Sequence, residues 1–279
     1  MLIAAPNLAE GRDSIVVSRI AGPGPPLLDL HTDADHNRSV LTYGTSRNAL
    51  LTACLDMAKR AVEVLDLRTH RGVHPTTGVL DVLPFVQDSE EELARGLAAE
   101  AASELALGLR LPVYLYGAAH PGRRSLPDLR RQIAAGVAPD LGPLKPHPSA
   151  GVVCVGARPP LVAFNVNLRG PVEAARQVAA TMRSSSGGSR SLPGVRALGL
   201  ALDSRGLVQV SMNLVEPHAT GPLLAFQRAS ELARDAGLQI VEAEVVGLVP
   251  DALLPQLEAV PLRVPARGVV QAAGETGIR

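Results

Sequence analysis

The second half of the chain alternates apolar and polar positions in short runs that are separated by two stretches of helical period. Strands are expected at 161–168, 195–202, 207–215 and 240–249, and helices at 171–183 and 221–236. A turn at Asp203-Ser204-Arg205-Gly206 joins the middle two strands as a hairpin. The order βαββαβ is that of the ferredoxin-like split βαβ motif, which predicts helices on one face of an antiparallel sheet.

The first half repeats this order more loosely. Strands are expected at 2–5, 27–31, 38–43 and 79–85, helices at 13–20 and 46–64, and an added helix and strand at 89–109 and 113–116. The acidic first turn of the added helix complements the helix dipole. We therefore predict an α/β (α+β) protein of two ferredoxin-like βαββαβ-type subdomains packed together, with a ligand cleft between or beside them.

Two prolines after Arg158 break regular structure and mark the boundary between the halves. We assign residues 1–160 to an N-terminal subdomain and residues 161–260 to a C-terminal one. Residues 261–279 are rich in Gly, Ala, Val and Arg and lack periodicity. They are expected to form a loosely attached or disordered tail.

Composition narrows the class of protein. The 279 residues are 46% hydrophobic, and Lys+Arg and Asp+Glu balance at 27 each, with 2% aromatics. A neutral chain with few aromatic rings has neither the basic surface nor the stacking platforms that nucleic acids need. The N-terminus carries no basic region and is broken by Pro6, and no apolar run is long enough to span a bilayer. We therefore expect a cytoplasmic protein without a membrane partner.

The two cysteines, Cys54 and Cys154, lie within apolar patterns. We expect both to be small buried hydrophobes. Their number and spacing provide neither a disulfide framework nor a zinc motif.

His74 is the chemically most informative position, because it lies in a loop that leads into an apolar strand. Histidine changes charge near neutral pH and suits proton transfer, although a loop histidine can equally be a structural hydrogen-bonding group. Asp66, His70 and His74 recur every four residues and could hold a metal on one helix face. Gly72 and Pro75 argue against a helix there, so no metal site is expected.

Several segments together carry a family resemblance. They are PNLAEGR at 6–12, DHNRSV at 35–40, the run 66–85, PVYLY at 112–116, APDLGP at 138–143, VGAR at 155–158, AFNVNL at 163–168, QVSMNL at 209–214 and VGLVP at 246–250. In this order, from about residue 2 to residue 254, they resemble the formiminotransferase domain of glutamate formimidoyltransferases. The resemblance implies two similar α/β subdomains, in agreement with the duplicated pattern.

The resemblance also implies an activity. The family transfers the formimino group of N-formimino-L-glutamate to N5 of tetrahydrofolate in histidine degradation, with tetrahydrofolate as co-substrate and without a metal, and its enzymes are often homodimers. His74 matches the essential second histidine of the family motif His-x-Gly-Glu-His-Pro-Arg and would be the general acid and base. The family's folate-binding segment matches Gly142, Pro143, Leu144, Lys145, Pro146, His147, Pro148, Ser149, Ala150 and Gly151.

Further polar residues are candidates for holding the two small-molecule substrates. Arg38, Arg158 and Lys145 could bind carboxylates, or be exposed or structural charges. Four amides alternate along two expected strands and suggest one polar row facing a cleft, although buried polar rows need partners in any protein. They are Asn165, Asn167, Gln209 and Asn213.

The chain departs from the family at several of these positions. Val73 and Thr76 replace the charged neighbours of His74, His31 replaces the second acid of an Asp-x-Asp pair, and Ala150 replaces an aromatic residue. The family's Arg-x-Gly-Glu-Tyr/Phe-Glu segment is absent around 126–136. Three functions stay open: formimino or formyl transfer to folate, an enzyme with a different one-carbon donor or acceptor, and a non-catalytic homologue that binds a ligand or a partner protein.

Overall fold

The computed structural model describes residues 1–23, 27–86 and 91–276, which form two compact units. The first contains Met1–Pro159 and the second Pro160–Glu275, with Thr276 grouped with the first. The division falls between the two prolines that interrupt regular structure after Arg158. None of the helices in the described ranges combines the length and the apolar character needed to cross a membrane.

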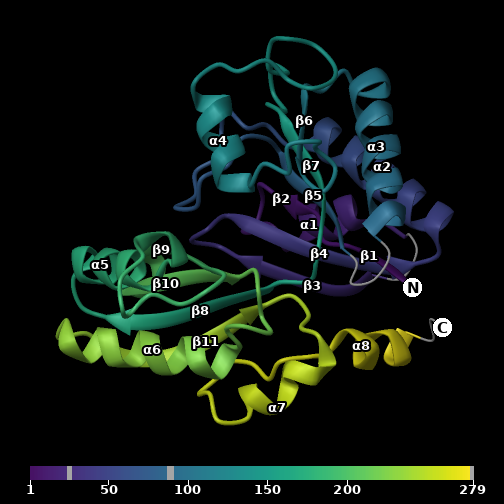
Figure 1. The fold of residues 1–279 in the computed structure, drawn as a ribbon. Helices are drawn as coiled ribbons and strands as arrows, with labels where there is room; N and C mark the ends of the chain where they lie inside the picture. The colour runs from purple at the N-terminus through teal and green to yellow at the C-terminus, as the bar shows by residue number, and fades with distance from the viewer. Residues whose placement is uncertain (24–26, 87–90, 277–279) are drawn as a thin grey trace. The chain divides into compact units, whose positions relative to one another are not determined.

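The second unit has the predicted βαββαβ order (Figure 1). Its elements are β8 (Val162–Arg169), α5 (Val172–Met182), β9 (Val195–Leu202), β10 (Leu207–Leu214), α6 (Pro222–Asp235) and β11 (Gln239–Val246). The strands form a four-stranded sheet in the order β11-β8-β10-β9, and every neighbouring pair is antiparallel. This is the ferredoxin-like arrangement, because each helix connects two strands that are separated by a third.

Alternation along the strands decides which face of this sheet is buried against the helices. Phe164, Val166 and Leu168 share one core with Ala179 of α5 and Ala229 of α6. Residues between them on β8 therefore point to the opposite face. The period-2 pattern in the sequence correctly separates the two faces.

The first unit contains a seven-stranded sheet. Its elements are β1 (Leu2–Ala4), β2 (Asn7–Leu8), α1 (Ser14–Ala21), β3 (Leu27–Asp33), β4 (Arg38–Thr45), α2 (Arg47–Val64), β5 (Leu80–Val86), α3 (Glu91–Gly108), β6 (Val113–Gly117), α4 (Leu126–Ala134) and β7 (Val153–Arg158). Antiparallel pairs give the order β3-β4-β1-β5, which is again ferredoxin-like. β7 and β6 extend the sheet beyond β5 by parallel pairing.

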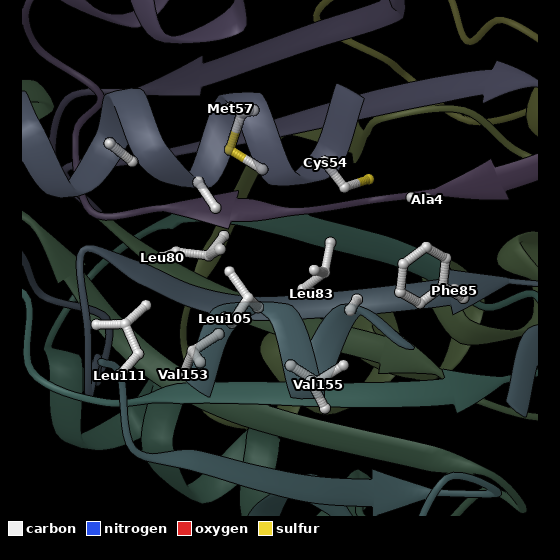
Figure 2. Packing of buried hydrophobic residues seen from close by; sticks show 14 of the residues in the cluster. Ala4, Cys54, Met57, Leu80, Leu83, Phe85, Leu105, Leu111, Val153 and Val155 are labelled. Atoms are coloured by element: carbon white, nitrogen blue, oxygen red, sulfur yellow. The ribbon is translucent and has the colours of Figure 1, made fainter. Parts of the chain in front are cut away.

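The main core of this unit lies between the sheet and the helices α2 and α3. Figure 2 shows Cys54 and Met57 of α2 on the side of the sheet that carries Leu80, Leu83 and Phe85 of β5, with Val155 of β7 in the same cluster. Cys54 and Cys154 are both buried free thiols, as the sequence predicts. A smaller core, which includes Cys154, lies on the opposite face, where α4 covers β6 and β7.

Two expectations are wrong or incomplete. The sequence pattern predicts no helix between β6 and β7, where the structure has α4. Residues 261–276 are not a loose tail, because Ala243 N donates to Pro261 O, Val269 N donates to Val249 O, and α8 (Val269–Thr276) buries two alanines. Two further short elements precede α8: the 3₁₀ turn Asp251–Leu253 and α7 (Leu254–Leu257). The expected start of α3 at Ser89 lies outside the described residues.

Candidate active site in the first unit

His74 lies in the connection between α2 and β5. α2 ends at Val64 and no helix forms again before Leu80, so Asp66, His70 and His74 do not share a helix face. Backbone hydrogen bonds hold the connection on both sides of His74. Val73 N donates to Asp35 O at 3.1 Å, and Val79 N donates to Ala150 O at 3.0 Å.

Gly72 allows this loop to approach the β3–β4 turn. A Cβ atom at Gly72 would lie 2.1 Å from the carbonyl oxygen of His36, which no side chain tolerates. The close approach brings the two imidazole rings of His36 and His74 into a stack, with centroids 5.8 Å apart and an angle of 29° between the planes. His36 belongs to the segment 35–40, and no local pattern in the sequence marks it as functional.

A β-bulge places an acid beside this loop. Asn7 of β2 pairs with Val82 and Leu8 pairs with Leu80, so Asp81 is an extra residue in β5. Bulges of this kind redirect a side chain and are frequent next to active sites. The Asp81 carboxylate is fully buried.

Two arginines neutralise the buried carboxylate. Arg38 Nη2 of β4 lies 2.6 Å from Asp81 Oδ2, and Arg130 Nη2 of α4 lies 2.5 Å from the same oxygen. Oδ1 accepts from the Thr77 amide at 2.8 Å and from its hydroxyl at 3.0 Å. Burial alone would raise the pKa of Asp81, but the two guanidinium groups and these donors hold it at about 2.

The same arginines also reach the backbone beside His74. Arg38 Nη2 donates to Pro75 O at 3.0 Å and Arg130 Nη1 donates to it at 3.2 Å. His74 Nδ1 lies 2.9 Å from this oxygen. Because a carbonyl oxygen only accepts, Nδ1 carries the proton in this contact, and in the neutral ring Nε2 carries the lone pair.

Burial and the positive charge of Arg38 keep the pKa of His74 below its usual value. Within the described residues, Nε2 has no hydrogen-bond partner in the structure. His70 contrasts with this, since its Nδ1 lies 3.1 Å from Ala9 O and 3.2 Å from Asn37 Nδ2. His74 therefore has the geometry of a neutral proton acceptor, and His70 that of a structural group.

The segment 142–151 is attached to the His74 loop. Ser149 O accepts from Leu67 N at 2.7 Å, and His147 and Gly151 exchange two backbone hydrogen bonds of 2.9 and 3.0 Å. Leu144 and Lys145 are exposed. The Ala150 side chain is buried in the main core and is therefore not exposed at the surface.

Arg158 pairs with Val86 at the end of β5, so its backbone lies roughly 13 Å along the strand from Val82. Its side chain reaches Tyr116, which also interacts electrostatically with Arg130. Burial lowers the pKa of Arg158, and a hydrogen bond with the Tyr116 side chain partly offsets this effect. His31 lies on β3, where it pairs with Val40 of β4.

Comparison with known proteins assigns the chain to a family. Models of the formiminotransferase domain match it twice, the N-terminal subdomain over residues 1–158 and the formiminotransferase domain over residues 163–260. The chain belongs to the formiminotransferase family.

Two curated relatives match this chain over most of their own length. Glutamate formimidoyltransferase of Streptococcus pyogenes serotype M1 is 35% identical, with 88% of this chain and 87% of the relative covered. The protein of the same description from Thermoplasma acidophilum is also 35% identical, with 89% and 88% covered. Formimidoyltransferase-cyclodeaminase of Sus scrofa is 36% identical, with 88% of this chain but only 49% of the relative covered.

The four amides predicted from the sequence lie in the sheet of the second unit of this family member. Gln209 Nε2 donates to Asn167 Oδ1 at 2.9 Å, and Asn167 Nδ2 donates to Glu242 Oε1 at 3.1 Å. Asn165 is buried on β8 and Asn213 is exposed on β10. All four lie on the sheet face that points away from the helical core, as the alternation indicates.

Sequence reasoning missed Asp81, Arg130 and the charged residues that surround the amides. Glu242 forms ion pairs with Arg205 and Arg263, and Arg263 also pairs with Glu244. A signal for α4 was present, because Ser125 and Asp128 have the spacing of a helix start. No local pattern marks which arginine of that helix turns toward Asp81.

Proposed function

We propose that this member of the formiminotransferase family transfers the formimino group of N-formimino-L-glutamate to N5 of tetrahydrofolate, with His74 as general acid and base. The observation that carries the proposal is the hydrogen bond of His74 Nδ1 to Pro75 O, which leaves Nε2 with the lone pair. The names of the relatives support the reaction.

The chemistry requires one group that first accepts and then returns a proton. The N5 amine attacks the formimino carbon and forms a C–N bond while its proton passes to His74 Nε2. The C–N bond to glutamate then breaks, and the same proton moves to the departing glutamate nitrogen. The lowered pKa keeps the ring neutral before attack and makes its protonated form a stronger acid for the second step, while it weakens the ring as a base in the first step.

Charged groups from other elements surround His74 although its neighbours Val73 and Thr76 are uncharged. Arg38, Arg130 and Asp81 together carry one net positive charge beside the ring. We propose that Arg38 binds a substrate carboxylate, whereas the hydrogen bonds of Arg130 within the described residues go only to Asp81 and Pro75. The segment 142–151, with Lys145 exposed, is the proposed folate site, and the amides of the second unit and Arg158 are proposed substrate contacts.

The test compares wild type with His74→Ala and with His218→Ala, which removes an exposed histidine of the second unit. Calorimetry measures tetrahydrofolate binding, and an assay measures glutamate released from N-formimino-L-glutamate. We expect His74→Ala to lower kcat by about 10²- to 10⁴-fold and His218→Ala to leave it unchanged. Tetrahydrofolate binding without turnover would contradict the proposal and indicate a different donor or a non-catalytic homologue. No binding at all would also contradict it and indicate a different acceptor or a non-catalytic homologue.

The donor, the oligomeric state and the location also stay proposals. A formyl donor in place of the formimino compound would release glutamate in the same assay and would identify an altered donor. We propose a cytoplasmic homodimer. Light scattering on the purified protein and fractionation of cells test these two points.

A further inference from the structure

The carbonyl group of Pro75 is the point at which the charged cluster meets His74. Its oxygen accepts hydrogen bonds from Arg38 Nη2 at 3.0 Å, from Arg130 Nη1 at 3.2 Å and from His74 Nδ1 at 2.9 Å. Hydrogen bonds from charged donors are stronger than neutral ones, and two guanidinium groups hold this one oxygen. The position of this oxygen determines where the imidazole ring can lie.

We propose that Asp81 and Arg130 are positioning residues that hold the Pro75 carbonyl and thereby keep His74 in the tautomer that protonates Nδ1 and leaves Nε2 as the base. The proposal rests on the proposed function of His74. It adds residues from β5 and α4 that act through the backbone and not on the substrate. The neighbours of His74 in the sequence cannot fix its tautomer by charge, because Val73 and Thr76 are uncharged.

The contacts of Asp81 support positioning over substrate binding. Its two oxygens accept hydrogen bonds from Thr77 N, from Thr77 Oγ1 and from the guanidinium groups of Arg38 and Arg130. Its side chain has 0% exposure. A carboxylate with these four donors is fixed in place and has no remaining lone pair for a ligand. Asp81 can therefore orient the arginines but cannot receive a substrate proton.

Arg130 is directed inward by the way α4 packs. Leu129 is fully buried in the smaller core, and the Ser125 hydroxyl caps the helix by accepting from Asp128 N. The Arg130 side chain is 18% exposed and has one Nη on Asp81 and the other on Pro75. Arg131, one residue further, is 73% exposed and pairs with Asp128 on the surface.

The neighbouring arginines give a matched pair of variants. Arg130→Met and Arg131→Met each remove one positive charge from the same helix, and Arg130→Lys keeps the charge while losing the planar group that reaches two acceptors. ¹⁵N NMR of protein labelled at histidine reports the tautomer of His74, which is assigned by His74→Gln. Steady-state kinetics with tetrahydrofolate and N-formimino-L-glutamate give kcat and KM.

We expect Arg130→Met to give His74 a mixture of both neutral tautomers and to lower kcat about ten- to a hundred-fold, as for small misplacements of catalytic groups. KM should change by less than about two-fold, Arg130→Lys should recover part of kcat, and Arg131→Met should match wild type. A single unchanged tautomer in Arg130→Met, or a raised KM with normal kcat, would overturn the proposal.

The two readouts separate this proposal from the proposed function. If wild type and His74→Ala have equal transferase activity, His74 is not the base, and the NMR experiment still decides whether Arg130 fixes its ring. If His74 is the base and the tautomer does not depend on Arg130, only the positioning proposal fails. The remaining six of the seven histidines in the same spectra report whether each variant is folded.

Discussion

The His74 cluster of the first unit and the amide network of the second lie on sheets that share a ferredoxin-like order of four strands, although the first sheet has seven strands in total. The two networks end differently. In the second unit Gln209, Asn167 and Glu242 donate and accept among themselves, and two arginines complete the ion pairs. In the first unit the network runs from Asp81 through Arg130 and Pro75 to an imidazole with an unshared lone pair.

The comparison indicates which of two polar networks is suited to chemistry. Buried polar groups must have partners in any fold, so the hydrogen bonds among Asn167, Gln209 and Glu242 stabilise the sheet whether or not these side chains also contact a substrate. A network that ends on an ionisable group, with its last acceptor free, holds that group ready for proton transfer.

The largest stability effect is expected from removing the buried charge of the first network. Asp81→Asn leaves Arg38 and Arg130 without a counter-charge, and we expect a loss of about 3–5 kcal/mol in the free energy of unfolding. Urea titration measures it. Glu242→Gln is the matched change in the second network, whose carboxylate is 21% exposed, and it should cost about 1 kcal/mol or less. Equal losses would remove the distinction between the two networks.

Cutting the amide network should have an intermediate effect. Gln209→Ala removes the donor of the 2.9 Å hydrogen bond to Asn167 Oδ1. We expect the free energy of unfolding to fall by about 1–3 kcal/mol, because a buried acceptor loses its donor. Thermal unfolding checks the loss. Unchanged stability with a raised KM would instead make Gln209 a substrate contact and not part of a closed structural network.

The smallest effect is expected from pH. The pKa of His74 is lowered from 6.5 in the folded protein, mainly by burial, so the unfolded chain binds a proton there first as pH falls. The stability that neutral His74 contributes is therefore present above pH 6.5 and decreases as pH falls below it. Between pH 7.5 and 5, wild type should lose about 1 kcal/mol more than His74→Gln in urea titrations. A larger loss in His74→Gln would reverse the sign and refute the lowered pKa.

Most of the fold could be predicted from the sequence, because the periods that indicate helices and strands depend only on neighbouring residues. The alternation in 195–202 and 207–214 gives β9 and β10 almost to the residue, and Gly72 and Pro75 correctly exclude a helix through His74. The tail was predicted poorly, because residues 261–276 are ordered through backbone contacts to Ala243 and Val249, which no period in the sequence reveals.

The sequence alone determined the two βαββαβ units, the loop around His74 and the family resemblance, because period and motif are properties of neighbouring residues. Only the tertiary structure decided which charges reach that loop. Arg130 lies 55 residues from Pro75 in the chain, and its selection over Arg131 follows from a rotation of about 100° per residue around a helix whose buried face is set by Leu129. The extra residue at Asp81 also depends on pairing with β2, so a strand pattern within β5 cannot reveal it.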